Sequence, residues 1–374
     1  MSATPTAVPA VAVPPPLPKI VVIMGAGSSA DFGVPTLRSI FKDPSALAYL
    51  KSDDRLHEWL QRVFWDQRGH SYGSSDRSLT IEEMLTIIRD WQSEDKDAAE
   101  LKDIDDIRRR LYVLIYHAVY VGKSSNKAHL NGLIETLRRS FSQITWASFN
   151  WDCIFEASYW YNSGPPMSPG TRSNPHLVIR LAGWRDGFAR NTYLKLHGSV
   201  NWWLVDGKPT YLKWASYGDL ADKWKQLEEG KTNDTPIILE PSAYKYEDPI
   251  YPEILKPQWD EFYRRLREAD CVLVLGYSLP DNDPQARCKI LTAFQVNKNC
   301  RWAVVDPSAE VRAKYERLLG SRRLTTFDQG LAGFTVNLEE NLKTAFPNVE
   351  IKPKPASPAA VVPVAAAPAT TTTS

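Results

Sequence analysis

The feature that most constrains the fold of this chain is a short apolar run that leads directly into a glycine-rich segment. The run is KIVVIM at 19–24, and GAGSSADFG follows it at 25–33. A β-branched run that ends on glycines before a helical pattern is typical of the first strand of a doubly wound α/β sheet. Because these runs are continuously apolar rather than alternating, we predict a mostly parallel, Rossmann-like sheet that is covered on both faces. The further runs lie at 144–149, 192–197, 236–240, 271–276 and 302–306.

The segments between these runs carry the period of amphipathic helices. Apolar residues recur at i, i+3, i+4 and i+7 over 81–88, 107–119 and 130–137. They predict a helical insertion over about residues 45–140, between the first two strands. The stretch 159–190 is rich in Gly, Pro, Ser and Asn, and we interpret it as an irregular connection, either a lid or a plain loop.

The two ends of the chain have the composition of tails. Residues 1–18 contain six prolines and no charged residue, and Pro, Ala, Val and Thr dominate residues 351–374. Proline lacks a backbone donor and fixes φ, so such stretches stay extended rather than pack. We predict disordered tails, either tethers to a partner or plain solvated ends, around one domain at 19–350.

Charge and cysteine usage exclude several classes of protein. Lys plus Arg is 45 and Asp plus Glu is 44, so a net charge of +1 gives no global footprint for nucleic acid or a membrane surface. The apolar runs fall short of the ~20 residues that span a bilayer. The four cysteines form no C-x-x-C pair, which argues against a zinc ribbon. The N-terminal tail does not resemble a secretory signal, so we expect a cytoplasmic protein without a bound metal.

The glycine-rich segment favours a phosphate-binding turn. Gly25 and Gly27 permit positive φ and let the backbone approach a ligand closely. Ser28 or Ser29 would cap the helix that follows, whose N-terminal amides favour a pyrophosphate. The spacing is G-x-G-x5-G rather than the G-x-G-x2-G of ordinary dinucleotide folds, so a tight turn without a ligand is an equal alternative on spacing alone.

A longer match extends this segment. Residues 25–39, GAGSSADFGVPTLRS, resemble the sirtuin fingerprint G-A-G-x-S-x-x-x-G-I-P-D-F-R-S. Further segments match sirtuin motifs in the same order, namely FNWD at 149–152, LHGS at 196–199, LGYSLP at 275–280 and VVDPS at 304–308. The chain thus resembles sirtuin-like NAD-binding domains, which implies NAD as its substrate. The resemblance assigns NAD binding to Gly25, Ala26, Gly27, Ser29, Pro35, Thr36, Arg38, Gly276, Ser278 and Asp306.

The resemblance also implies three catalytic residues. His197 would be the base toward a ribose hydroxyl or a water, since an ordinary imidazole pKa near ~6.5 suits neutral pH. Asn150 would fix the water or the ribose edge, and Asp152 would bond the nicotinamide carboxamide. The residues alone favour a plainer interpretation, in which His197 is structural and the other two form an Asx turn or a helix cap.

Other polar and aromatic positions allow two interpretations each. Arg38 would pair with a phosphate or lie at the surface. Trp202 and Trp203 would wall the nicotinamide pocket or belong to the core. The run DNDP at 281–284 lacks the spacing of a calcium loop, and we interpret it as a turn and helix cap.

The sequence departs from sirtuin deacylases in ways that bear on activity. Two C-x-x-C pairs hold their zinc module, and this sequence has none. Thr36, Leu37 and Phe149 also replace family residues. The residues of these motifs resemble those of bacterial sirtuin-like proteins that hydrolyse NAD+ in antiphage defence more than those of the deacylases.

This closer resemblance implies an NAD+ hydrolase that releases nicotinamide and ADP-ribose. Such an enzyme would be restrained as a homo-oligomer or by a partner, such as a HerA-like ATPase or an Argonaute-type protein, because an unregulated one would drain the cell's own NAD+. An NAD-dependent deacylase or ADP-ribosyltransferase is one alternative. A non-catalytic NAD or ADP-ribose sensor that gates a partner is the other.

Overall fold

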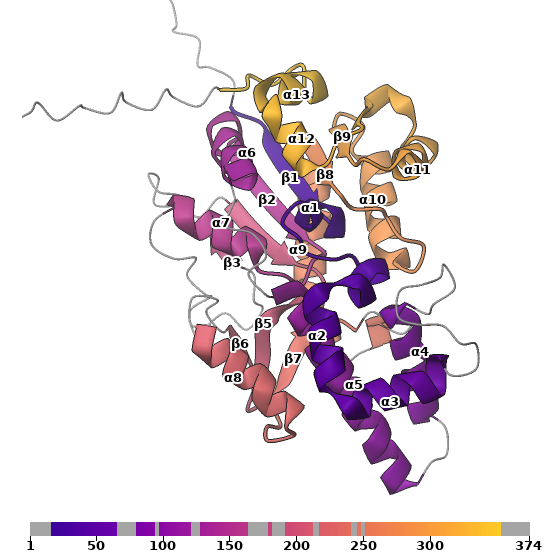
Figure 1. Cartoon of the computed structure of the whole chain (residues 1–374). Helices are drawn as coiled ribbons and strands as arrows, with labels where there is room; N and C mark the ends of the chain where they lie inside the picture. The colour runs from indigo at the N-terminus through magenta and orange to yellow at the C-terminus, as the bar shows by residue number, and fades with distance from the viewer. Residues whose placement is uncertain are drawn as a thin grey trace, which may run out of the picture.

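The predicted strand at 19–24 lies inside a seven-stranded sheet. In the computed structural model, β1 (Lys19–Met24) pairs in parallel with β2 (Gln143–Ser148) on one side and with β8 (Cys271–Leu275) on the other (Figure 1). The strand order is β10-β9-β8-β1-β2-β4-β3, and β3 alone among these strands runs antiparallel. The α/β, mostly parallel Rossmann-like sheet predicted from the apolar runs is thus confirmed. The remaining strands are β3 (Ile179–Leu181), β4 (Asn191–Lys195), β9 (Arg301–Val305) and β10 (Leu324–Phe327).

The structure describes most of the chain. The described residues are 16–65, 80–93, 97–120, 128–163, 179–181, 191–211, 217–240, 245–247 and 251–352. Nearly all of the two predicted tails, and most of the predicted connection at 159–190, lie outside these ranges. Inside that connection, α7 (Ile154–Ser163) continues as helix, and β3 forms a short edge strand. None of the described helices is long and apolar enough to cross a bilayer.

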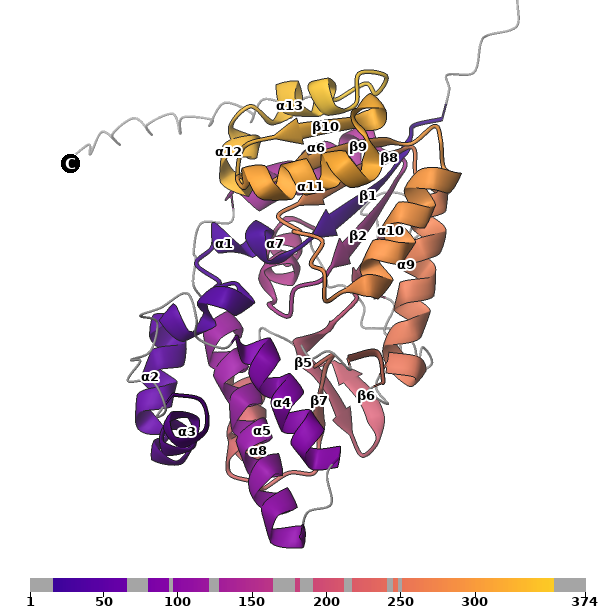
Figure 2. The same cartoon turned by 90° about the vertical axis from the view of Figure 1, so that its right-hand side faces the viewer.

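Helices cover both faces of the large sheet. Successive parallel strands are joined by right-handed crossovers, so the direction in which the chain moves across the sheet sets the face that each helix covers. The chain moves one way from β1 to β2 and the other way from β8 to β9, which places the two helix layers on opposite faces (Figure 2). One layer holds α6 (Ala128–Ser140), α7, α12 (Leu331–Val336) and α13 (Leu338–Ala345), and the other holds α9 (Lys256–Glu268), α10 (Pro284–Val296) and α11 (Ala309–Leu319).

A second, smaller unit lies beside the carboxyl ends of the large sheet (Figure 1). Its three strands run in the order β6-β5-β7 and are antiparallel. Apolar side chains of β5 and β7 join those of the insertion helices in a second buried cluster. The strands are β5 (Gly198–Val205), β6 (Lys208–Tyr211) and β7 (Thr235–Ile238), and the helices are α2 (Pro44–Ser52), α3 (Asp54–Leu60), α4 (Ile81–Ser93), α5 (Ala98–Tyr120) and α8 (Tyr217–Glu228). Short helical turns complete the chain as α1 (Ala26–Ala30), η1 (Leu37–Lys42), η2 (Gln61–Trp65), η3 (Lys245–Glu247), η4 (Tyr251–Leu255) and η5 (Ser321–Arg323).

The apolar run at 236–240 is a strand, but its assignment to the parallel sheet is wrong. It forms β7, which pairs antiparallel with β5. The run is continuously apolar because both of its faces are buried: Ile237 packs in the cluster of the large sheet and Ile238 in the cluster of the helical insertion. Continuous apolarity reports burial on two faces and does not distinguish parallel from antiparallel pairing.

The paired tryptophans of β5 are core residues. The side chains of Trp202 and Trp203 are both fully buried. Trp203 meets Trp224 edge to face, with 4.9 Å between ring centroids, while Trp202 belongs to the cluster of the large sheet. The two side chains therefore join the small unit to its neighbours, which favours the core interpretation over a pocket wall.

Candidate functional site

Two glycine turns meet where the chain reverses its direction across the large sheet. Gly25 N donates to Leu275 O at 3.0 Å, and Gly27 N donates to Gly276 O at 2.9 Å. The first turn follows β1 and the second follows β8, so both lie at the carboxyl edge of neighbouring strands. Ligands of open α/β sheets bind at such a switch point.

The glycines of these turns are required by the close approach of two backbones. Gly276 has φ +57°, and a Cβ there would lie 2.3 Å from Ser28 N. A Cβ on Gly25 would lie 2.5 Å from Tyr277 Cα. Two amides of the loop thus bond to the β8 turn rather than remaining for a ligand, while Ala26 at the start of α1 is exposed. The glycines of the fingerprint are therefore required, before any ligand is considered, for the close packing of these two loops.

Substitution of Gly276 tests this packing requirement. We expect Gly276→Ala to lower the free energy of unfolding by about 3 kcal/mol, because it adds strain at positive φ to an overlap with backbone that cannot rotate away. The matched control is Gly207→Ala, which has a similar φ of +70° but nothing within 4 Å of the added Cβ. Urea unfolding of both variants measures the difference. Equal losses would show that φ alone matters.

Asn150 ties the end of β2 to the glycine turn. Its Nδ2 donates to Gly25 O at 2.9 Å and to Ser29 Oγ at 2.9 Å. Its backbone N donates to Ser148 Oγ at 3.1 Å. The amide donor is thus committed to the glycine turn, and Oδ1 is the atom with which this side chain accepts a hydrogen bond.

Asp152 forms the Asx turn that the plainer interpretation predicted, and it also binds Ser29 of the glycine-rich segment. Its Oδ1 accepts from Ile154 N at 3.0 Å, which is the predicted Asx turn at the start of α7. Its Oδ2 accepts from Ser29 Oγ at 2.7 Å, so the same buried carboxylate also fastens the NWD segment to α1. Asn150 and Asp152 share Ser29 as a partner, and the three side chains form one hydrogen-bonded group.

A buried ion pair lies behind this group. Lys195 Nζ of β4 is 3.3 Å from Glu156 Oε1 of α7, and both side chains are fully buried. Lys195 also donates to the backbone oxygen of Asp152. Burial raises the pKa of Glu156, against the opposing effect of the lysine. Burial also raises the pKa of the Cys153 thiol well above its usual range, which disfavours the reactive thiolate form.

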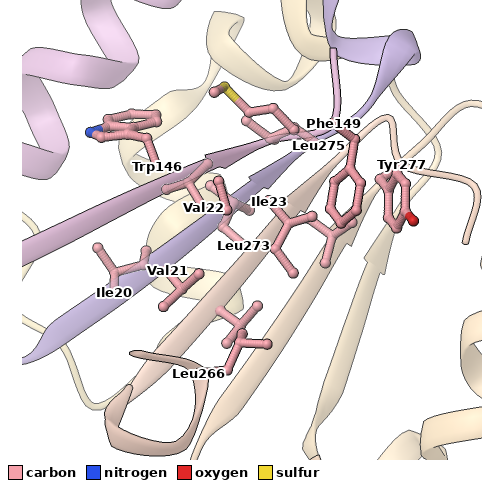
Figure 3. Packing of buried hydrophobic residues seen from close by; sticks show 14 of the residues in the cluster. Ile20, Val21, Val22, Ile23, Trp146, Phe149, Leu266, Leu273, Leu275 and Tyr277 are labelled. Carbon is pink, nitrogen blue, oxygen red and sulfur yellow. The ribbon is translucent and has the colours of Figure 1, made fainter. Parts of the chain in front are cut away.

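His197 follows β4 and joins the site through Phe149. Its backbone oxygen accepts from Trp151 Nε1 at 3.1 Å and from Leu239 N at 2.8 Å. Its ring meets that of Phe149 edge to face at 5.1 Å, and Phe149 in turn stacks on Tyr277 at 4.0 Å (Figure 3). The imidazole is 14% exposed. The strand ends of β2, β4 and β8 thus converge on one aromatic group.

The imidazole faces the buried carboxylate of Asp283, with which no sequence motif pairs it. His197 Nε2 lies 3.1 Å from Asp283 Oδ2, which is ion-pair distance, although the contact does not have the geometry of a hydrogen bond. Asp283 caps α10 by accepting from Ala286 N at 3.3 Å, as the turn-and-cap interpretation of DNDP predicted. DNDP follows the apolar run that became β8, so the sequence places Asp283 near this edge of the sheet but does not pair it with His197. The carboxyl ends of parallel strands meet at one edge.

Three other predicted NAD-binding residues follow β8 and β9 at the same edge and differ in how deeply they are buried. Gly276 N donates to Val305 O at 3.0 Å, which brings the end of β9 beside the glycine turns. Asp306 follows it, buried, with a pKa raised by burial, and accepts from Ser308 N at 2.8 Å. Ser278 is exposed in the turn after β8.

The last three lie where η1 begins, with Pro35 and Thr36 before it and Arg38 in its first turn. Pro35 and Thr36 are half-buried, and Thr36 N donates to Ser39 Oγ at 3.0 Å within the same segment. The side chain of Arg38 lies outside the described part of the structure, so its predicted phosphate contact stays a prediction. Within the described ranges, no group of three or more His, Cys, Asp or Glu side chains is placed to hold a metal ion.

Solved Sir2 structures are similar to this chain, while no family model and no curated protein matches it. One, "Structural Basis for the Mechanism and Regulation of Sir2 Enzymes", is 12% identical, covers 88% of this chain and 94% of its own, and has a TM-score of 0.43. A Sir2 homologue–NAD complex is 14% identical to this chain. The match covers 87% of this chain and 90% of the homologue, with a TM-score of 0.43. A mutant Sir2 homologue in complex with 2'-O-acetyl ADP ribose is 14% identical to this chain. The match covers 87% of this chain and 92% of the homologue, with a TM-score of 0.45.

Proposed function

We propose that this chain is a sirtuin-like NAD+ hydrolase that cleaves NAD+ to nicotinamide and ADP-ribose. The observation that carries the proposal is the position of Asn150, whose side chain bonds to both Gly25 and Ser29. His197 approaches the same strand ends through Phe149. The motifs that resemble the sirtuin fingerprint at widely separated positions of the sequence are therefore neighbours in space.

The proposed reaction makes modest demands that these side chains can meet. Nicotinamide leaves as a neutral molecule from a cationic pyridinium, so no strong acid is needed. The ribose instead needs hydrogen-bond acceptors and a positioned water. In the proposal His197 accepts a proton from a ribose hydroxyl or from the water, and Asn150 Oδ1 accepts a hydrogen bond from the same group. Asp152 holds the turn that presents Asn150. In the proposal Asp152 also bonds the nicotinamide carboxamide.

The nucleotide would lie along the carboxyl edge of the sheet. Ala26, Ser278 and Asp306 follow three neighbouring strands there, and Asp306 would bond the hydroxyls of the adenosine ribose. Pro35, Thr36 and Arg38 complete the proposed NAD+ contacts. The biological role we propose is that of a regulated, NAD-depleting effector of bacterial antiphage defence. It would act as a homo-oligomer or with a HerA-like ATPase, and the resemblance of the motifs supports this part.

A product assay separates this function from its alternatives. The purified full chain is incubated with NAD+, alone and with a candidate HerA-like partner, and the products are quantified chromatographically. A hydrolase releases nicotinamide and free ADP-ribose in equal amounts. Excess nicotinamide over ADP-ribose, with acetyl-ADP-ribose or labelled protein, identifies a deacylase or transferase. NAD+ binding without nicotinamide release in both conditions identifies a sensor and overturns the proposal.

A further inference from the structure

The Asp283 carboxylate is fully buried, and the structure surrounds it with hydrogen-bond donors. Tyr246 and Tyr277 both donate their hydroxyls to it, the second at 3.2 Å. It also caps the 13-residue helix α10, whose N-terminus favours a negative charge. Burial and the adjacent carboxylate raise the pKa of both tyrosines well above the usual range, so both remain protonated donors. A buried carboxylate held in this way is a fixed negative charge.

This fixed charge faces the imidazole of the proposed base. Asp283 Oδ2 lies 3.1 Å from His197 Nε2, while the rings of Phe149 and Trp259 face the imidazole from other sides at centroid distances of 5.1 and 6.1 Å. Those two rings carry no charge, and the hydroxyls of Tyr246 and Tyr277 point to the carboxylate. The electrostatic environment that these groups give the imidazole is therefore dominated by Asp283.

We propose that Asp283 is the positioning residue of His197. Its negative charge, 3.1 Å from Nε2, attracts the proton of the neutral imidazole to that nitrogen, which makes Nδ1 the nitrogen that accepts a proton from the ribose hydroxyl or the water. When that proton arrives, the adjacent negative charge stabilises the imidazolium. The proton ends on Nδ1, and it returns to solvent after the products leave. This inference rests on the proposed function.

The first test measures the imidazole itself and needs no turnover. NMR titration of the wild type should give His197 an imidazole pKa above the ordinary value, with the proton of the neutral form on Nε2, and the resonance is assigned by its loss in His197→Gln. Asp283→Asn keeps the size and the helix cap but removes the charge. We expect it to lower the pKa of His197 by about 1 to 3 units, the effect of one opposite charge at this distance.

The second test is the pH profile of nicotinamide release. A base works in its neutral form, so the acid limb of kcat/KM follows the pKa of His197. In Asp283→Asn we expect this limb to move to lower pH by the same interval. The plateau of kcat should fall at least about 10-fold, because the imidazolium is no longer stabilised, with a smaller change in KM.

The matched control is Asp281→Asn in the same loop. Asp281 is 79% exposed and pairs with Arg287 and Lys314 on the surface, so its loss should change neither the pKa of His197 nor the pH profile. An unchanged His197 pKa in Asp283→Asn, or a wild-type pKa at or below the ordinary value, would reduce Asp283 to a helix cap and overturn the inference. A shifted pKa in a protein that releases no nicotinamide would instead refute the proposed function and leave the pair intact.

Discussion

His197→Ala is expected to lower the rate of nicotinamide release by about 10²- to 10⁴-fold, the usual contribution of a general base. The loss should fall on kcat more than on KM, because the proposed proton transfer occurs in the transition state and the proposed nucleotide contacts lie on other strands. The imidazole is 14% exposed, so its removal leaves a small, solvent-reachable space rather than a sealed cavity. Steady-state kinetics of nicotinamide release measure the effect, and calorimetric binding of NAD+ confirms that the site is intact.

The control for this variant is a histidine of similar burial that lies elsewhere. His129 of α6 contacts Thr335 Oγ1 of α12 through Nδ1 at 3.0 Å. It therefore lies in the helix layer of α6 and α12, away from α9 and α10, which face the imidazole of His197. His129→Ala should release nicotinamide at the wild-type rate. Asn150→Ala should lose activity as His197→Ala does, because its amide fixes the glycine turn through Gly25 and Ser29. Wild-type rates in both site variants would remove the catalytic assignment of these two residues.

The sequence predicted the central strands of the large sheet well because they are buried on both faces. Runs such as the one at 19–24 have no polar face, and the glycines after it fix where the strand must end. The same criterion failed for 236–240, since an antiparallel strand between two clusters is equally apolar. It also missed β5, which begins within the LHGS motif and carries the polar residue Asn201 in its middle. Pairing partners are a tertiary property that no single run contains.

The candidate site could be predicted only as far as strand ends could be placed. The edge shared by Gly25, Asn150 and His197 follows from three motifs that each close a strand. The partner of His197 could not be recognised in the same way, because Asp283 is a sufficient helix cap by local criteria. Its second role depends on the distance between two loops that are far apart in the chain. The buried pair behind Asp152 is hidden for the same reason.

That pair provides the prediction with the largest effect on stability. We expect Lys195→Met to lower the free energy of unfolding by about 3 to 5 kcal/mol, because it leaves Glu156 buried without its cation. The defect should be greatest at high pH and should shrink as the pH falls. Burial raises the pKa of Glu156 in the folded state, so protonation favours the folded form below that pKa. Urea unfolding at about pH 8 and about pH 5 measures both effects.

A double variant separates the lost charge pairing from lost packing. Adding Glu156→Gln to Lys195→Met removes the unpaired charge, and we expect the double variant to recover more than half of the lost stability. Its unfolding free energy should also lose the added pH dependence. Activity should recover less, because Lys195 also donates to the backbone oxygen of Asp152 and methionine cannot. If the double variant is as unstable as the single one, the loss comes from packing around the lysine stem. The role of the Lys195 charge would then be limited to its hydrogen bond with the backbone oxygen of Asp152, which holds the turn that carries Asn150.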